Sequence, residues 1–259
     1  MIAIIDFGSQ FTQLIARKVR EAGVYSQIYP FNVPVEKIKN AEAIILSGGP
    51  NSVLDKNSPT LDKRIWELPL PILAFCYGFQ LMTVHYGGKV VKRDSAREYG
   101  KTKLELTGKS ELVKNIPKTT IVWMSHEDGI EKMPDGFVKL AETSNAPIAA
   151  FENQKINRYG LQFHPEVHHC ENGVNYINNF LFSIANVKKD WDLSDFAGDE
   201  INSVKKLVEQ KKVICGISGG VDSSVAALIV SKAVGKNLKC IFVDRQDFQC
   251  LNLNRRHRL

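Results

Sequence analysis

One cysteine lies where a strand-like segment meets a helix-like one. The apolar run Ile72–Phe75 is typical of a buried strand, and apolar residues recur at helical spacing after Gly78. Cys76 therefore falls on a sharp turn, with the small residues Ala74 and Gly78 two positions before and after it. Such a turn exposes the sulfur near a helix N-terminus, where the dipole favours a thiolate nucleophile. The alternative interpretation is a buried core cysteine.

A candidate base and its orienting group follow far downstream. His164 and Glu166 flank Pro165 at the end of a second strand-like stretch. A cysteine nucleophile needs a base within hydrogen-bond reach, and the base needs a group that orients it. Together with Cys76 these residues are a candidate Cys-His-Glu triad. His126 is a rival base, but His164 is favoured because it has a carboxylate neighbour.

These motifs resemble those of a class I glutamine amidotransferase domain. Three further motifs narrow the resemblance to the amidotransferase half of the GMP synthetase family: Asp6-Phe7-Gly8-Ser9-Gln10, Ser47-Gly48-Gly49-Pro50 and Trp123-Met124-Ser125-His126. All five occur in the order of the family. The resemblance implies that Cys76 attacks the side-chain amide of glutamine, that His164 donates a proton to the departing ammonia, and that water then releases glutamate.

The Gly48-Gly49 pair follows a third strand-like run and could simply form a turn with positive φ. We favour a functional interpretation, because a tetrahedral intermediate needs backbone N–H donors at its oxygen. The resemblance assigns that oxyanion hole to the amides of Gly49 and Tyr77. It also implies contacts with glutamine from Gly48, Gln80, Ser125 and His126.

A glycine-rich loop lies in the last third of the chain. The apolar run Val213–Ile217 leads into Ser218-Gly219-Gly220-Val221-Asp222-Ser223-Ser224, and an apolar helical stretch follows up to Gly235. Strand, glycine loop and helix together form a cradle for phosphate, although this loop lacks the lysine of a Walker A motif. The loop resembles the pyrophosphate loop of N-type ATP pyrophosphatases. The resemblance implies that these seven residues bind ATP or pyrophosphate, with ATP and Mg²⁺ used by the intact family.

The elements that must position these residues alternate along the first part of the chain. Strand-like runs at 2–5, 24–29, 43–46 and 72–75 are separated by helical patterns at 12–22, 35–39 and 61–68. This alternation predicts a parallel α/β sheet with its sites at the carboxyl ends of the strands. Residues 89–156 are richer in strands, at 89–92, 103–106, 121–124, 138–140 and 148–151, and 174–184 is helical.

The expected fold class is therefore α/β, and the resemblance makes it flavodoxin-like, with a mixed sheet and helices on both faces. We expect a class I glutamine amidotransferase domain over 1–187 and a linker with a helix over 188–212. An incomplete Rossmann-like βαβ unit of the adenine-nucleotide α-hydrolase type is expected over 213–259.

Composition limits the classes of function. The chain of 259 residues is 44% apolar, and neither a membrane span nor a signal peptide is expected. Five scattered cysteines without a C-x-x-C pair indicate the cytoplasm rather than a disulfide scaffold or zinc site, and His168-His169-Cys170 is interpreted as a turn without metal. Four arginines against one aspartate in residues 245–259 supply half of the net charge of +6, so nucleic-acid binding is not expected.

The resemblance stops at Asp244, after which the family has an XMP site and a dimerisation domain that makes it a homodimer. We therefore expect a truncated or frameshifted member of the GMP synthetase family, with glutamine as a partner. ATP and XMP would be partners only of an intact synthetase domain, and the chain alone is expected to make no GMP. The alternatives are a stand-alone glutaminase or γ-glutamyl hydrolase, against which the Ser218–Ser224 loop argues, and a catalytically silent partner subunit.

Overall fold

The computed structural model describes residues 1–92 and 97–242 and divides the chain into two units, Met1–Trp191 and Asp192–Leu259. The interpretation of the sequence from Asp244 onward concerns residues outside the described ones. No helix in the described ranges combines the length and apolar character that crossing a membrane requires.

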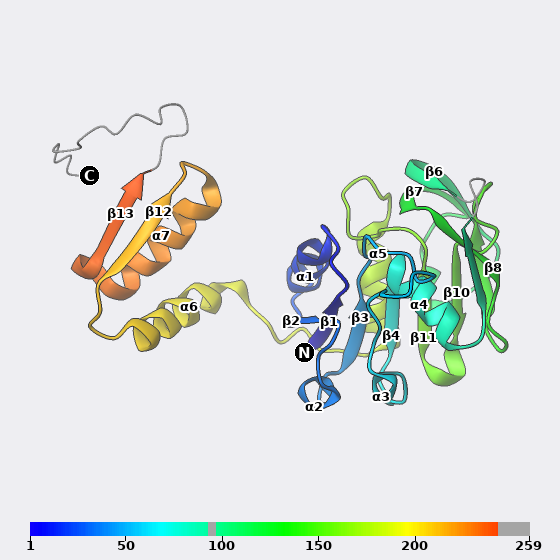
Figure 1. The fold of residues 1–259 in the computed structure, drawn as a ribbon, viewed down its shortest axis with the longest axis horizontal. Helices are drawn as coiled ribbons and strands as arrows, with labels where there is room; N and C mark the ends of the chain where they lie inside the picture. The colour runs from blue at the N-terminus through cyan, green and yellow to red at the C-terminus, as the bar shows by residue number, and fades with distance from the viewer. Residues whose placement is uncertain (93–96, 243–259) are drawn as a thin grey trace. The chain divides into compact units, whose positions relative to one another are not determined.

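The first unit is built on a mixed sheet of nine strands in the order β2-β1-β3-β4-β11-β10-β9-β6-β7 (Figure 1). Its parallel half consists of β1 (Ile2–Asp6), β2 (Ser26–Pro30), β3 (Ala43–Leu46), β4 (Ile72–Phe75) and β11 (Arg158–Leu161). Its antiparallel half consists of β10 (Ala150–Asn153), β9 (Val138–Glu142), β6 (Glu98–Leu106) and β7 (Thr119–His126). Sites are expected where the carboxyl ends of the parallel strands meet their loops.

Helices cover both faces of the sheet. On one face lie α1 (Thr12–Glu21) and α5 (Gly173–Asn178), which continues as a π-helical segment over Asn179–Ile184. On the other lie α2 (Val35–Ile38), α3 (Lys63–Trp66) and α4 (Tyr77–His85). Along β1 the buried side chains alternate between the two layers, as strand geometry requires. The predicted flavodoxin-like α/β fold class is confirmed.

A separate two-stranded ribbon was not predicted. β5 (Lys89–Lys92) does not join the large sheet but pairs antiparallel with β8 (Asp128–Lys132). No local pattern marks β8, because Ile130 is its only large apolar residue and strand formation there depends on pairing with β5. Short 3₁₀ turns occur at Glu111–Val113, Gln154–Ile156 and Gly235–Asn237.

The second unit contains α6 (Leu193–Val208), β12 (Val213–Ile217), α7 (Val221–Val234) and β13 (Leu238–Phe242). β12 and β13 are parallel, so the predicted βαβ unit is present. The helix α6 lies within residues 188–212, where the sequence predicted a linker with a helix. The strand expected at 213–217 is present as β12, but its apolar side chains are not buried: Ile214 is 70% exposed, and Phe242 of β13 is 60% exposed.

Candidate active site

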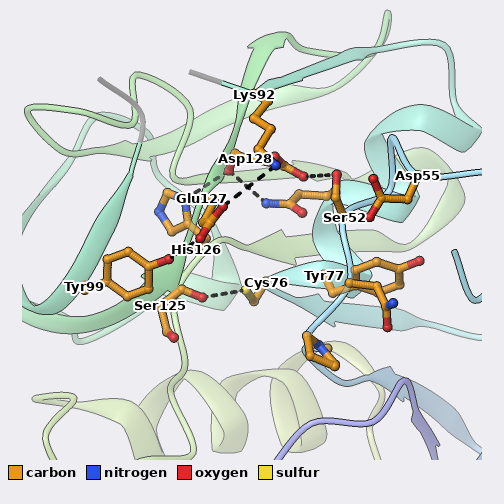
Figure 2. A pocket seen from close by; sticks show the side chains of 14 residues that line it. Ser52, Asp55, Cys76, Tyr77, Lys92, Tyr99, Ser125, His126, Glu127 and Asp128 are labelled. Atoms are coloured by element: carbon orange, nitrogen blue, oxygen red, sulfur yellow. Dashed lines mark hydrogen bonds and ion pairs between the residues drawn. The ribbon is translucent and has the colours of Figure 1, made fainter. Parts of the chain in front are cut away.

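Cys76 occupies a strained turn between β4 and α4. Its φ of 46° and ψ of −104° are unusual for a residue with a side chain, and the chain passes directly from the last residue of β4 through Cys76 into the first turn of α4. A Cβ on Gly78 would lie 2.7 Å from the Cβ of Leu46, so the turn requires glycine there. The Cys76 thiol donates a hydrogen bond to the carbonyl of Ser125, 3.4 Å away (Figure 2).

The candidate base reaches Cys76 because β11 lies beside β4. Leu161 pairs with Phe75, so the segment after β11 ends next to the elbow. Nδ1 of His164 lies 2.8 Å from Oε1 of Glu166, and both side chains are buried. Since a carboxylate accepts, Nδ1 carries the proton and Nε2 is the nitrogen available for exchange with the thiol.

Gly48 lies between the nucleophile and the base. A Cβ there would stand 2.7 Å from Cε1 of His164 and 3.5 Å from the Cβ of Cys76. Burial by itself would lower the pKa of His164, but Glu166 and Cys76 outweigh burial and raise that pKa to about 10. An imidazolium at neutral pH can stabilise a thiolate beside it and later give its proton to a leaving nitrogen.

The amides predicted to form an oxyanion hole belong to residues at the elbow. Tyr77 is the first residue of α4, so its N–H has no acceptor within the helix. Gly49 packs tightly against Phe7, whose carbonyl would lie 2.8 Å from a Cβ on Gly49, and the ring of Phe7 packs on that of Tyr77. Gly49 and Tyr77 both line the same pocket as Cys76.

The turn after β1 supports this arrangement. Oδ1 of Asp6 accepts hydrogen bonds from the amides of Gly8 and Ser9, at 2.9 and 3.2 Å, and from the hydroxyl of Thr12 at 2.6 Å. The same turn carries Phe11, whose ring meets the His164 ring edge-on at 5.2 Å between centroids. The Asp6–Gln10 motif therefore fixes the turn that places the Phe11 ring against His164 of the candidate triad.

An open pocket of about 320 Å³ lies in front of Cys76. Of the residues predicted to contact glutamine, Gln80, Ser125 and His126 line it, whereas Gly48 does not. The complete lining is Gly49, Pro50, Asn51, Ser52, Asp55, Cys76, Tyr77, Gln80, Lys92, Tyr99, Ser125, His126, Glu127 and Asp128. Sequence patterns alone missed the charged part of this lining, which comes partly from the β5–β8 ribbon.

Asp128 organises one wall of the pocket (Figure 2). Its backbone carbonyl accepts hydrogen bonds from Nε2 of Gln80 at 2.9 Å and from Nδ1 of His126 at 3.0 Å. One of its carboxylate oxygens accepts from Ser52, while the other, Oδ1, is buried without a hydrogen-bond partner in the described ranges. Gln80 and His126 therefore fix the backbone carbonyl of Asp128, and both side chains also line the pocket.

Cys170, His168 and His169 lie near the triad in the sequence but are held by burial and ring packing. Burial raises the pKa of Cys170 to about 12, which leaves its thiol protonated and unreactive. His169 stacks on Trp123 at 4.7 Å between ring centroids, and His168 packs edge-on against His169.

In the second unit the glycine-rich loop joins β12 to α7. Gly219 has a φ of 82°, and Gly220 precedes the first residue of α7. The hydroxyl of Ser223 lies 3.2 Å from that of Ser218 and donates to the carbonyl of Gly220 at 3.0 Å. The predicted phosphate-loop residues are therefore gathered at a helix N-terminus.

The fold and the site define a class I glutamine amidotransferase: the sequence profile of that family matches residues 3–184, and the chain belongs to it. A profile described as NAD synthase matches residues 193–248. Among individual proteins the chain is similar to the glutamine-hydrolysing GMP synthases of Brachyspira hyodysenteriae and Caldicellulosiruptor saccharolyticus, each 51% identical. Each alignment covers 94% of this chain and 48% of the relative, so the chain spans about half the length of these relatives.

A solved structure shows a related likeness. A Thermoplasma acidophilum protein described as a GMP synthase subunit is 30% identical to this chain and superimposes with a TM-score of 0.65. The match covers 71% of this chain and 93% of that protein.

Proposed function

We propose that this chain provides the glutamine-hydrolysing activity of a GMP synthase, releasing glutamate and ammonia. The observation that carries the proposal is the juxtaposition of Cys76, on its strained elbow, with the buried His164–Glu166 pair. The ammonia would serve the ATP-dependent amination of XMP to GMP by a synthetase. The names of the relatives support this assignment.

In the proposed mechanism the Cys76 thiolate attacks the side-chain carbonyl carbon of glutamine, and the amides of Gly49 and Tyr77 stabilise the oxyanion. His164 gives its proton to the amide nitrogen, so that ammonia leaves and a γ-glutamyl thioester remains on Cys76. His164 then takes a proton from water, which attacks the thioester. Glutamate is released and the Cys76 thiolate is regenerated, while Glu166 holds the imidazole in place throughout.

The pocket chemistry fits an α-amino acid. Three carboxylates, those of Asp55, Glu127 and Asp128, line it, and we assign the α-ammonium group of glutamine to this acidic part of the lining. Lys92, at the rim, lies 4.0 Å from Glu127 and would attract the α-carboxylate. When the side-chain amide of glutamine lies at Cys76, its α-ammonium group is then near carboxylates and its α-carboxylate is near Lys92.

For the second unit we propose that the loop Ser218, Gly219, Gly220, Val221, Asp222, Ser223 and Ser224 binds the phosphates of ATP. Its position at the N-terminus of α7 favours an anion. Asp222, in the first turn of α7, would supply a carboxylate ligand to the Mg²⁺ that accompanies the nucleotide.

A direct assay separates the proposed function from its alternatives. The purified chain is incubated with glutamine, with asparagine or with a γ-glutamyl dipeptide, and the released products are quantified. We expect glutamate and ammonia in equal amounts from glutamine alone. Preference for the dipeptide would identify a γ-glutamyl hydrolase, and absence of glutamate release would indicate a silent partner subunit.

A further inference from the structure

Glu98 is a buried acidic residue that does not line the pocket but faces His126, which does. Glu98 and His126 are direct cross-strand partners on β6 and β7, so their side chains project from the same face. Oε2 of Glu98 lies 3.4 Å from Nε2 of His126, and the two side chains are 3% and 1% exposed. The other carboxylate oxygen of Glu98 accepts a hydrogen bond from Thr143 at 2.7 Å.

The hydrogen-bond directions leave Nε2 of His126 facing Oε2 of Glu98, and neither atom has a hydrogen-bond partner in the described ranges. Nδ1 of His126 must donate to the carbonyl of Asp128, because a carbonyl only accepts. In a neutral ring Nε2 would then present a lone pair to an ionised Glu98, and two acceptors would face each other in a buried site. A proton shared between Nε2 and Oε2 would remove this repulsion and make the pair electrically neutral, the arrangement that burial favours.

The pair holds one end of the pocket wall. Through Nδ1, His126 fixes the carbonyl of Asp128, which also anchors Gln80 on α4. The preceding residue, Ser125, places its carbonyl 3.4 Å from the Cys76 sulfur. A shift of the His126 ring would therefore move the segment that carries both the contact to the nucleophile and the unpartnered carboxylate oxygen of Asp128.

We propose that Glu98 is a positioning residue that acts through His126 to fix the Ser125–Asp128 wall, and that it thereby sets the affinity for glutamine. The proposal rests on the glutaminase activity proposed above. It differs from the expectation that His126 contacts glutamine directly, because both ring nitrogens already face protein groups. Cys76, His164 and Glu166 come from other elements, so the chemical step should be affected less than binding.

The test is steady-state glutamine hydrolysis by the full chain carrying Glu98→Ala, Glu98→Gln or His126→Asn. Removal of the carboxylate in Glu98→Ala should raise KM about tenfold and change kcat by less than about threefold, the pattern expected when ground-state binding is lost. Glu98→Gln should restore KM to within about twofold of the parent, because its amide can donate to a neutral Nε2 while its oxygen still accepts from Thr143. His126→Asn keeps a donor near Asp128 but loses the group facing Glu98, so KM should again rise about tenfold.

Glu105→Ala is the matched control, since Glu105 lies on the same strand in an exposed ion pair with Lys118 and should leave KM unchanged. Thermal unfolding of each variant separates local from global effects. Should Glu98→Ala fail to fold, Glu98→Gln and His126→Asn decide the question. An unchanged KM in Glu98→Ala or His126→Asn, or an equal defect in Glu98→Gln and Glu98→Ala, would overturn the positioning role. A parent chain without glutaminase activity would instead contradict the proposed function itself.

Discussion

Glu166 holds His164 across a single proline, with its Oε1 2.8 Å from Nδ1 of the imidazole and both side chains buried. This contact fixes the tautomer of the ring and opposes the effect of burial on its protonation. Glu166 orients the ring of His164 and, together with Cys76, raises its pKa, and both effects can be tested.

Stability should depend on pH through this pair. The pKa of His164 rises from its ordinary value of 6.5 to about 10 in the folded protein. The corresponding stabilisation is therefore fully present below pH 6.5 and is lost as the pH rises through about 10. Urea unfolding from pH 6 to pH 10 should show a stability advantage of the parent over Glu166→Gln that shrinks with increasing pH. A difference that grows with pH would contradict this assignment.

The two triad partners of the nucleophile should differ in importance. His164→Ala should lower kcat for glutamine by about 10³-fold, because a positioned acid and base is lost. Glu166→Gln should cause a smaller loss, since this residue orients the ring without transferring the proton itself. Initial rates of glutamate release measure both effects. An inactive His126→Ala beside an active His164→Ala would reverse the assignment of the base.

Gly48 should be required for activity more than for folding. A methyl group there would stand 2.7 Å from the His164 ring, which must then move away from Cys76. Gly48→Ala should lower kcat at least about tenfold with little change in the melting temperature, as small misplacements of reacting groups do. Gly198→Ala is the control, because no atom lies within 4 Å of its added Cβ. Parent-like turnover in Gly48→Ala would argue against the close approach of His164 and Cys76.

Arg158 should be essential for the fold rather than the chemistry. Its buried guanidinium donates to the hydroxyl of Tyr86 and to the backbone carbonyls of Trp66, Leu68, Leu70, Ile156 and Asn157. Arg158→Met would leave several of these acceptors unsatisfied, at a cost of about 3 kcal/mol or more. Chemical denaturation measures the loss, with Arg64→Met at the surface as the control. A loss no larger than that of Arg64→Met would contradict this role.

The sequence predicted the parts of the fold and site that depend on local patterns. The apolar run before Cys76, the small residue at Gly78 and the carboxylate two positions after His164 can all be recognised along the chain. The family resemblance added the grouping of these distant segments, which the pairing of β4 with β11 accomplishes in space.

The remaining features depend on tertiary pairing. β8 has one large apolar residue and forms against β5, so no periodicity indicated it. Glu98 becomes the partner of His126 only through the register of β6 on β7. The exposure of Ile214 and Phe242 follows from the small number of elements packed on β12 and β13 in the described part of the second unit, not from the apolar sequence of the strands themselves.

The most direct test of the proposed glutaminase site is glutamate release by the parent chain, Cys76→Ala and Cys170→Ser. Cys76 occupies the elbow beside His164, whereas Cys170 is a buried thiol with a raised pKa. We expect the parent and Cys170→Ser to hydrolyse glutamine at similar rates and Cys76→Ala to release no glutamate above background. Glutamate release by Cys76→Ala at the parent rate would contradict the assignment of this site as a cysteine-dependent glutaminase.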